Sequence, residues 1–113
     1  MAEQLEASNA HLITTHAVML EIGNALARQR HRAIAVRLLF ALEIDPNVEI
    51  LPLSVQLYNQ ALQLYQARPD KDWGLTDCVS YVVMQERGIT EVLTSDKHFQ
   101  QMGFRALLLE LPA

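Results

Sequence analysis

The stretch TDCVSYVVMQERGITEVLTSD, residues 76–96, predicts a helix and a strand in direct succession. Apolar side chains cover most sides of the helical part, with Thr76 as the expected N-cap and Gly88 as the expected end. EVLTS, residues 91–95, predicts a short strand, and Asp96 follows it directly. A helix closed by glycine that leads straight into a strand is typical of α/β proteins.

The same alternation extends in both directions along the chain. Further strands are predicted at residues 10–14, 48–53 and 105–111, and further helices at 16–29, 30–44, 54–67 and 96–103. Residues 1–8 look like the tail of a helix, while Thr14 or Thr15 and then Ser54 are the expected N-caps. No linker or repeat divides this pattern. It predicts a single α/β domain over residues 1–113 with parallel strand pairs.

Composition limits the function classes. The chain has 113 residues, half of them hydrophobic, and a net charge of -4, so it is not a generally basic nucleic-acid binder, although a local basic patch is compatible with this charge. Its single cysteine, Cys78, allows no internal disulfide. No apolar run is long enough for a membrane span and no secretion signal is visible, so we expect a cytoplasmic location.

Three acids are predicted to approach one edge of the sheet. Asp96 follows a strand, Glu21 lies in the helix after another strand, and Asp77 opens a helix. Functional groups of open α/β sheets gather beyond the carboxyl ends of the strands. Each acid also has a plainer interpretation, favoured when it is taken alone. Asp77 and Asp96 would cap helices and Glu21 would be solvated.

Two segments resemble a known family. DKDWGLTDCVSYVVMQERGITEVLTSDKHFQQMGFRAL, residues 70–107, resembles the C-terminal half of PIN-domain proteins, particularly the VapC-type toxin ribonucleases. TTHAVMLEIGNAL, residues 14–26, resembles the family segment that carries a glutamate. The resemblance spans roughly residues 9–109 and implies a three-layer α/β/α fold around a mostly parallel sheet.

Matched residue by residue, the resemblance implies a metal site and an activity. Glu21, Asp77 and Asp96 correspond to three members of the family's acidic cluster, which would hold Mg²⁺ or Mn²⁺ and hydrolyse RNA phosphodiesters. Thr76 matches the hydroxyl residue beside the third acid, where it would either position water or cap its helix. Asp70 and Asp72 are weaker matches to a further acid. The family also implies homodimers controlled by a protein antitoxin.

Other polar and aromatic residues have less specific interpretations. The cations that could meet RNA phosphates are Arg28, Arg30, Arg32, Arg37, Lys71 and Lys97, although the arginines also suit an ordinary solvated turn. His16, His31 and His98 show no zinc-type spacing. Trp73 and Phe99 are expected to pack the loop and short helix against the core, and Cys78 to be a core residue.

The sequence departs from the family at its beginning. Relatives start with a strand that ends in an aspartate, whereas the first aspartate here is Asp45. We therefore expect an N-terminally truncated domain without its central first strand. A misplaced start, a decayed gene and a fragment completed by another chain all remain open. The alternative functions are a noncatalytic remnant that dimerises or binds antitoxin, or a structural protein whose acids only cap helices.

Overall fold

The computed structural model describes residues 11–94 and 96–110, which divide into two compact units, one before and one after the boundary between Leu53 and Ser54. The helix tail predicted at residues 1–8 lies outside the described residues. A single domain over the whole chain stays a prediction.

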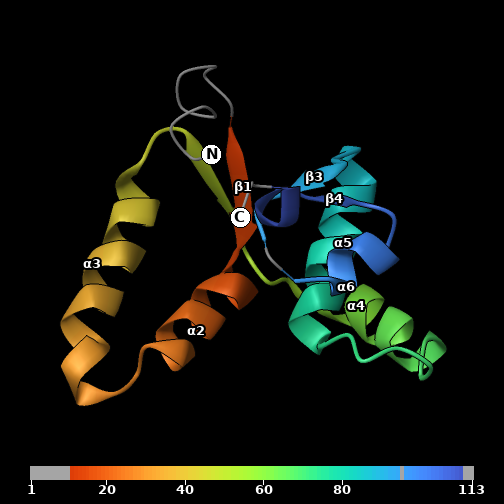
Figure 1. Ribbon diagram of the computed structural model, residues 1–113, viewed down its shortest axis with the longest axis horizontal. Helices are drawn as coiled ribbons and strands as arrows, with labels where there is room; N and C mark the ends of the chain where they lie inside the picture. The colour runs from red at the N-terminus through yellow and green to blue at the C-terminus, as the bar shows by residue number, and fades with distance from the viewer. Residues whose placement is uncertain (1–10, 95, 111–113) are drawn as a thin grey trace. The chain divides into compact units, whose positions relative to one another are not determined.

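The first unit is a parallel strand pair joined by two helices. Its elements are β1 (Leu12–Thr15), α2 (His16–Ala25), α3 (Gln29–Ile44) and β2 (Val48–Leu51). Figure 1 shows α2 and α3 as a helical hairpin that connects the end of β1 to the start of β2, while the two strands lie next to each other. β1 and β2 pair in parallel, in a register that runs from Leu12 opposite Val48 to Thr15 opposite Leu51. The predicted parallel pairing is confirmed here.

Capping explains where α2 begins and ends. The Thr15 hydroxyl accepts the Val18 N–H at 3.2 Å, so Thr15 and not Thr14 is the N-cap. The predicted extension of this helix to residue 29 is wrong, because α2 ends at Ala25. Arg32 donates from Nε and Nη2 to the Ala27 carbonyl at 3.2 and 2.7 Å, which stabilises the turn before α3.

The second unit contains a second parallel pair packed with three helices. Its elements are α4 (Val55–Ala67), α5 (Leu75–Arg87), β3 (Glu91–Val92), α6 (His98–Gln101), β4 (Arg105–Ala106) and the 3₁₀ helix η1 (Leu107–Glu110). In Figure 1, α4 and α5 lie side by side and β3 runs alongside β4. Ser54 caps α4 as predicted, with its hydroxyl accepting the Leu57 N–H at 3.1 Å.

Both strands of this pair are shorter than predicted. β3 covers two of the five residues expected to form a strand, and the strand expected at 105–111 gives way to η1 after Ala106. The Arg105 guanidinium explains the turn, because Nη2 and Nε lie 2.8 and 3.2 Å from the two Glu110 carboxylate oxygens. An extended chain would carry Glu110 roughly 16 Å along the strand, beyond this reach.

The core of the second unit fixes the position of α6. Met84 of α5, Phe99 of α6 and Phe104 form a buried cluster, and Tyr81 and Val92 pack against it. Trp73 is 6% exposed and stacks on Tyr81 with ring centroids 6.5 Å apart. The predicted packing roles of Trp73 and Phe99 are confirmed. No helix within residues 11–94 and 96–110 has the length and apolar character of a membrane span.

Candidate metal centre

Asp77 caps the helix that carries it. α5 begins at Leu75 with Gly74 as its N-cap, so the predicted capping role of Thr76 is wrong and Thr76 lies inside the first turn. Asp77 Oδ2 accepts the Gly74 N–H at 3.0 Å. This bond satisfies a backbone donor at the helix start and places a carboxylate where the helix dipole favours negative charge.

Asp96 binds the start of the short helix α6, whose N-cap position is occupied by Lys97. Its Oδ1 accepts the His98 N–H at 2.9 Å, and its own N–H donates to the Thr94 hydroxyl at 3.1 Å. These bonds hold the Asp96 carboxylate against the first turn of α6. The plainer capping interpretation is therefore correct for Asp77, while Asp96 bonds a backbone N–H of α6 from one residue before the N-cap position.

The two aspartates lie together, with His98 between them. His98 Nδ1 lies 3.4 Å from Asp77 Oδ2 and 3.2 Å from Asp96 Oδ1. One potential ligand atom from each residue falls within 4.8 Å of the other two, and no other such group occurs among the described residues. The side chains of Asp77, His98 and Asp96 are 20%, 30% and 41% exposed, so the group is open to solvent and to a bound ion.

His98 is the member of this group that sequence reasoning did not include. The test for zinc-type spacing compares histidines with one another, whereas His98 has two aspartates as neighbours. The available signal was local, because His98 lies two residues after Asp96, whose carboxylate accepts its backbone N–H. The turn formed by this bond places the His98 imidazole next to the Asp96 carboxylate.

The donor set suits a hard divalent cation. Each aspartate uses one oxygen for its bond to a helix start, while Asp77 Oδ1 and Asp96 Oδ2 make no hydrogen bond to the described residues. Two carboxylates with free oxygens are typical of Mg²⁺ and Mn²⁺ sites, and an imidazole nitrogen is a better ligand for Mn²⁺ than for Mg²⁺. The residues present therefore fit the predicted ions.

The structure does not place Asp70 and Asp72 with this group. Asp70 forms a bidentate ion pair with Arg68, in which both N–O distances are 3.0 Å. This hydrogen bonding lowers the pKa of Asp70 to about 2. Arg68 in turn lies over the Trp73 ring, 5.1 Å from its centroid. Asp70 therefore acts on the packing of Trp73 through Arg68.

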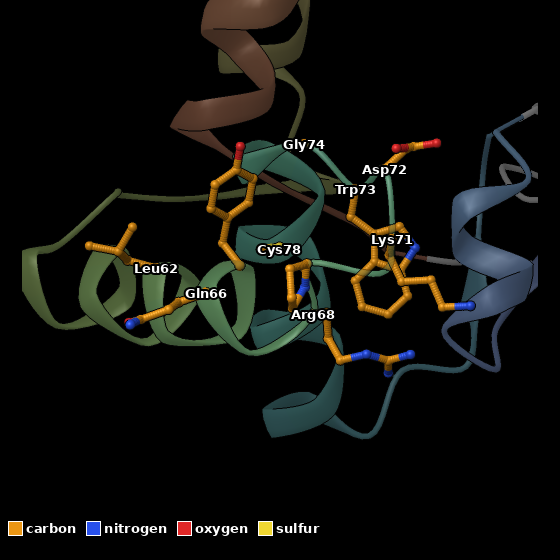
Figure 2. Close-up of a pocket in the computed structure, with 10 residues that line it drawn as sticks. Leu62, Gln66, Arg68, Lys71, Asp72, Trp73, Gly74 and Cys78 are labelled. Carbon is orange, nitrogen blue, oxygen red and sulfur yellow. The ribbon is translucent and has the colours of Figure 1, made fainter.

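Asp72 and Lys71 line an open pocket beside the start of α5. The pocket has a volume of about 770 Å³, and its ten lining residues include Gly74 and Cys78. Figure 2 shows Leu62 and Gln66 of α4 on one side and the loop residues Lys71 and Trp73 on the other. Gly74 connects the pocket rim to Asp77 through the capping bond.

The remaining predicted residues stay predictions as site residues. Glu21 is exposed on α2 in the first unit, and its approach to the two aspartates is not tested. Arg28, Arg30 and Arg37 are also exposed there, while Lys97 is exposed just before α6. Cys78 is fully buried. Its burial, and to a smaller extent the nearby charge of Asp77, raises the pKa of its thiol, which fits a core residue.

Comparison with known proteins identifies the family. The chain matches the PIN domain family over residues 1–105. No curated protein sequence is a significant match. A crystal structure of Mycobacterium tuberculosis VapC20, described as a sarcin–ricin loop cleaving toxin, is similar with a TM-score of 0.80. Its sequence is 24% identical, and the match covers 93% of this chain and 81% of that one. The predicted PIN-like α/β fold is confirmed, and the chain belongs to the PIN domain family.

Proposed function

We propose that the chain is a metal-dependent endoribonuclease of the VapC toxin type. One observation carries the proposal: a PIN domain whose Asp77 and Asp96 lie together, each with a carboxylate oxygen free of hydrogen bonds to the described residues. The similarity to VapC20, which is described as cleaving the sarcin–ricin loop, supports RNA as the substrate class. VapC-type activity is also what the two sequence segments imply.

Each residue has a defined task in this proposal. Asp77 and Asp96 would hold Mg²⁺ or Mn²⁺, Glu21 would supply a third carboxylate, and His98 would be a neutral donor beside them. The ion supplies positive charge for the scissile phosphate and makes bound water more acidic. Thr76, one residue before Asp77, is suited to orient water. Lys97 and Lys71 supply positive charge for flanking phosphates.

The partners of the family fit an apolar line on α3. Val36, Phe40 and Ile44 follow one another at a spacing of four residues and are 44%, 64% and 80% exposed. Contiguous exposed apolar residues mark protein interaction sites. This line supports a homodimer or an antitoxin complex. A cytoplasmic location is part of the same proposal, because toxin, antitoxin and RNA must meet.

The test compares cleavage of RNA by matched variants. Purified chain is incubated with a labelled sarcin–ricin loop RNA and an unstructured RNA, in Mg²⁺, Mn²⁺ or EDTA. We expect metal-dependent cleavage that Asp96→Asn abolishes. Glu86→Gln removes an exposed acid from α5 and should leave the rate unchanged. Cleavage that persists in Asp96→Asn would exclude this site as the source of activity.

The noncatalytic alternative has its own observation, because no aspartate precedes Asp45 in the sequence. We therefore expect this chain, which has fewer candidate carboxylates than the family pattern implies, to cleave RNA weakly. The purified chain must be shown to be folded before its rate is measured. No cleavage by the folded chain in Mg²⁺ or Mn²⁺ would favour a module that only dimerises or binds antitoxin.

A further inference from the structure

A closed ring of contacts connects the metal-site residues through Trp73. The Trp73 indole Nε1–H donates to Gln101 Oε1 at 2.9 Å, at the last residue of α6. At the first residue of α6, His98 Nδ1 lies 3.4 Å from Asp77 Oδ2. The same Asp77 oxygen accepts the N–H of Gly74, which follows Trp73 in the chain. The ring therefore runs along the whole of α6 and returns to its starting residue.

Trp73 is itself held firmly. The residue is 6% exposed, and its ring stacks on Tyr81 at 19° between planes, with the Arg68 guanidinium over it. Tyr81 packs in turn on Phe104, with ring centroids 5.7 Å apart. These contacts hold the indole N–H in one position. Gln101 is an exposed residue, yet its side chain accepts the hydrogen bond from this N–H.

α6 depends on such contacts because it is too short to be stable alone. It has four residues, and isolated helices far longer than this are marginal in water. Phe99 anchors its middle in the core, but one apolar anchor leaves rotation about that point open. The bond from Gln101 to Trp73 removes this freedom. Asp96 and His98, at the other end of α6, are then held next to Asp77.

We propose that Trp73 and Gln101 are positioning residues that set the spacing between Asp77 and the α6 ligands Asp96 and His98. The inference rests on the proposed function, since a bound divalent ion is what this spacing serves. Partners beyond the ligands themselves alter metal affinity by about 10- to 100-fold when they are removed. The same loss is expected here, although neither side chain belongs to the ligand group.

The experiment uses neighbouring glutamines of α6 in the full chain. Gln101→Met removes the acceptor with little change of size, and Gln100→Met is the matched control, because Gln100 is exposed and its side chain makes no hydrogen bond to the described residues. Calorimetric titration should show Mn²⁺ affinity weakened about 10- to 100-fold in Gln101→Met and unchanged in Gln100→Met. Trp73→Phe should match Gln101→Met, and the double variant should be no weaker than either.

A metal-free measurement separates this inference from the proposed function. The chain has one tryptophan, so NMR shows a single indole N–H resonance. Its protection from hydrogen exchange should be lost in Gln101→Met and retained in Gln100→Met and Gln101→Glu, which keeps an acceptor. Lost protection with unchanged Mn²⁺ affinity would overturn the positioning role alone. Mn²⁺ affinity that is absent from the wild type, or insensitive to Asp77→Asn, would overturn the metal centre on which both proposals stand.

Discussion

At the scale of single residues, each of the two aspartates has one oxygen that bonds a helix start and a second oxygen to which we assign metal binding. One oxygen of Asp77 caps α5 and one oxygen of Asp96 bonds the His98 N–H of α6, while the second oxygen of each has no hydrogen-bond partner among the described residues. Sequence position predicted both acids correctly as neighbours. It did not include His98, although His98 lies only two residues after Asp96, because the closeness of the imidazole to that carboxylate depends on the bond from the His98 N–H to Asp96 Oδ1.

Substitution of Asp77 should separate helix capping from metal binding. Asp77→Asn keeps an oxygen acceptor for the Gly74 N–H but removes the charge, whereas Asp77→Ala removes both. In EDTA we expect Asp77→Ala to lose about 0.5–1.5 kcal/mol of unfolding free energy and Asp77→Asn to lose less. In Mn²⁺ both should lack the metal-induced rise in Tm that the wild type shows. Thermal unfolding with and without metal checks both expectations, and a full Mn²⁺ shift in Asp77→Asn would contradict the second.

The ion pair of Asp70 with Arg68 should stabilise the folded chain at neutral pH and lose this effect in strong acid. Pairing with Arg68 lowers its pKa from 3.8 to about 2 in the folded chain. A depressed pKa stabilises the folded state above the unfolded value, and the contribution is lost as pH falls from 3.8 to about 2. The Tm difference between wild type and Asp70→Asn should therefore shrink over this interval. Because the pair is exposed, the effect should be small and should weaken further in high salt.

At the scale of elements, the presence of the helices followed from the sequence, whereas the end of α2, the N-cap of α5 and the lengths of the last two strands did not. Periodic apolar residues and the caps Thr15, Ser54 and Gly88 mark helix ends locally, so these could be read from neighbouring residues. The run at 105–111 is apolar enough for a strand, yet Arg105 binds both Glu110 and Glu91 and bends the chain. Such a bend depends on contacts between side chains in the folded chain. Hydrophobic periodicity along the sequence does not predict these contacts.

Gly88 gives a test of helix termination. It ends α5 at φ 65°, a left-handed conformation in which a Cβ costs roughly 1–2 kcal/mol. Gly88→Ala should lower the unfolding free energy by about that amount, and Gly88→Asn by less, because asparagine tolerates this conformation. Chemical denaturation measures both. Apart from the adjoining chain, no heavy atom of the described residues lies within 4 Å of the added Cβ, so an equal loss in the two variants would contradict this backbone explanation.

At the scale of the whole molecule, family membership rests on the match over residues 1–105, while the placement of Glu21 stays a prediction. Glu21 lies in a different compact unit from Asp77 and Asp96. Strand-to-helix placement predicts that all three acids approach one edge of the sheet, and the family resemblance implies that they form one site. The local pattern around Glu21, taken alone, favours a solvated helix residue.

The apolar line on α3 should govern association. Ile44 is 80% exposed, and a charge there should disrupt a surface that excludes water in a complex. We expect the wild type to dimerise in sedimentation equilibrium and Ile44→Lys to shift that equilibrium towards monomer. Glu43→Gln changes an exposed neighbour on the same helix and serves as the control. A wild type that is monomeric at all concentrations, or an Ile44→Lys dimer of unchanged affinity, would contradict a homodimer through this face.

The burial of Cys78 makes the reactivity of its thiol a measure of local opening at the start of α5. It is the only cysteine, it follows Asp77, and none of its surface is exposed. A thiol reagent can therefore react only during transient openings of this helix, and its trapping rate reports how often they occur. Ligands that hold the helix start in place should slow the trapping in proportion to their occupancy. The rate of thiol labelling at Cys78 therefore reports local opening one residue away from the proposed metal ligand Asp77.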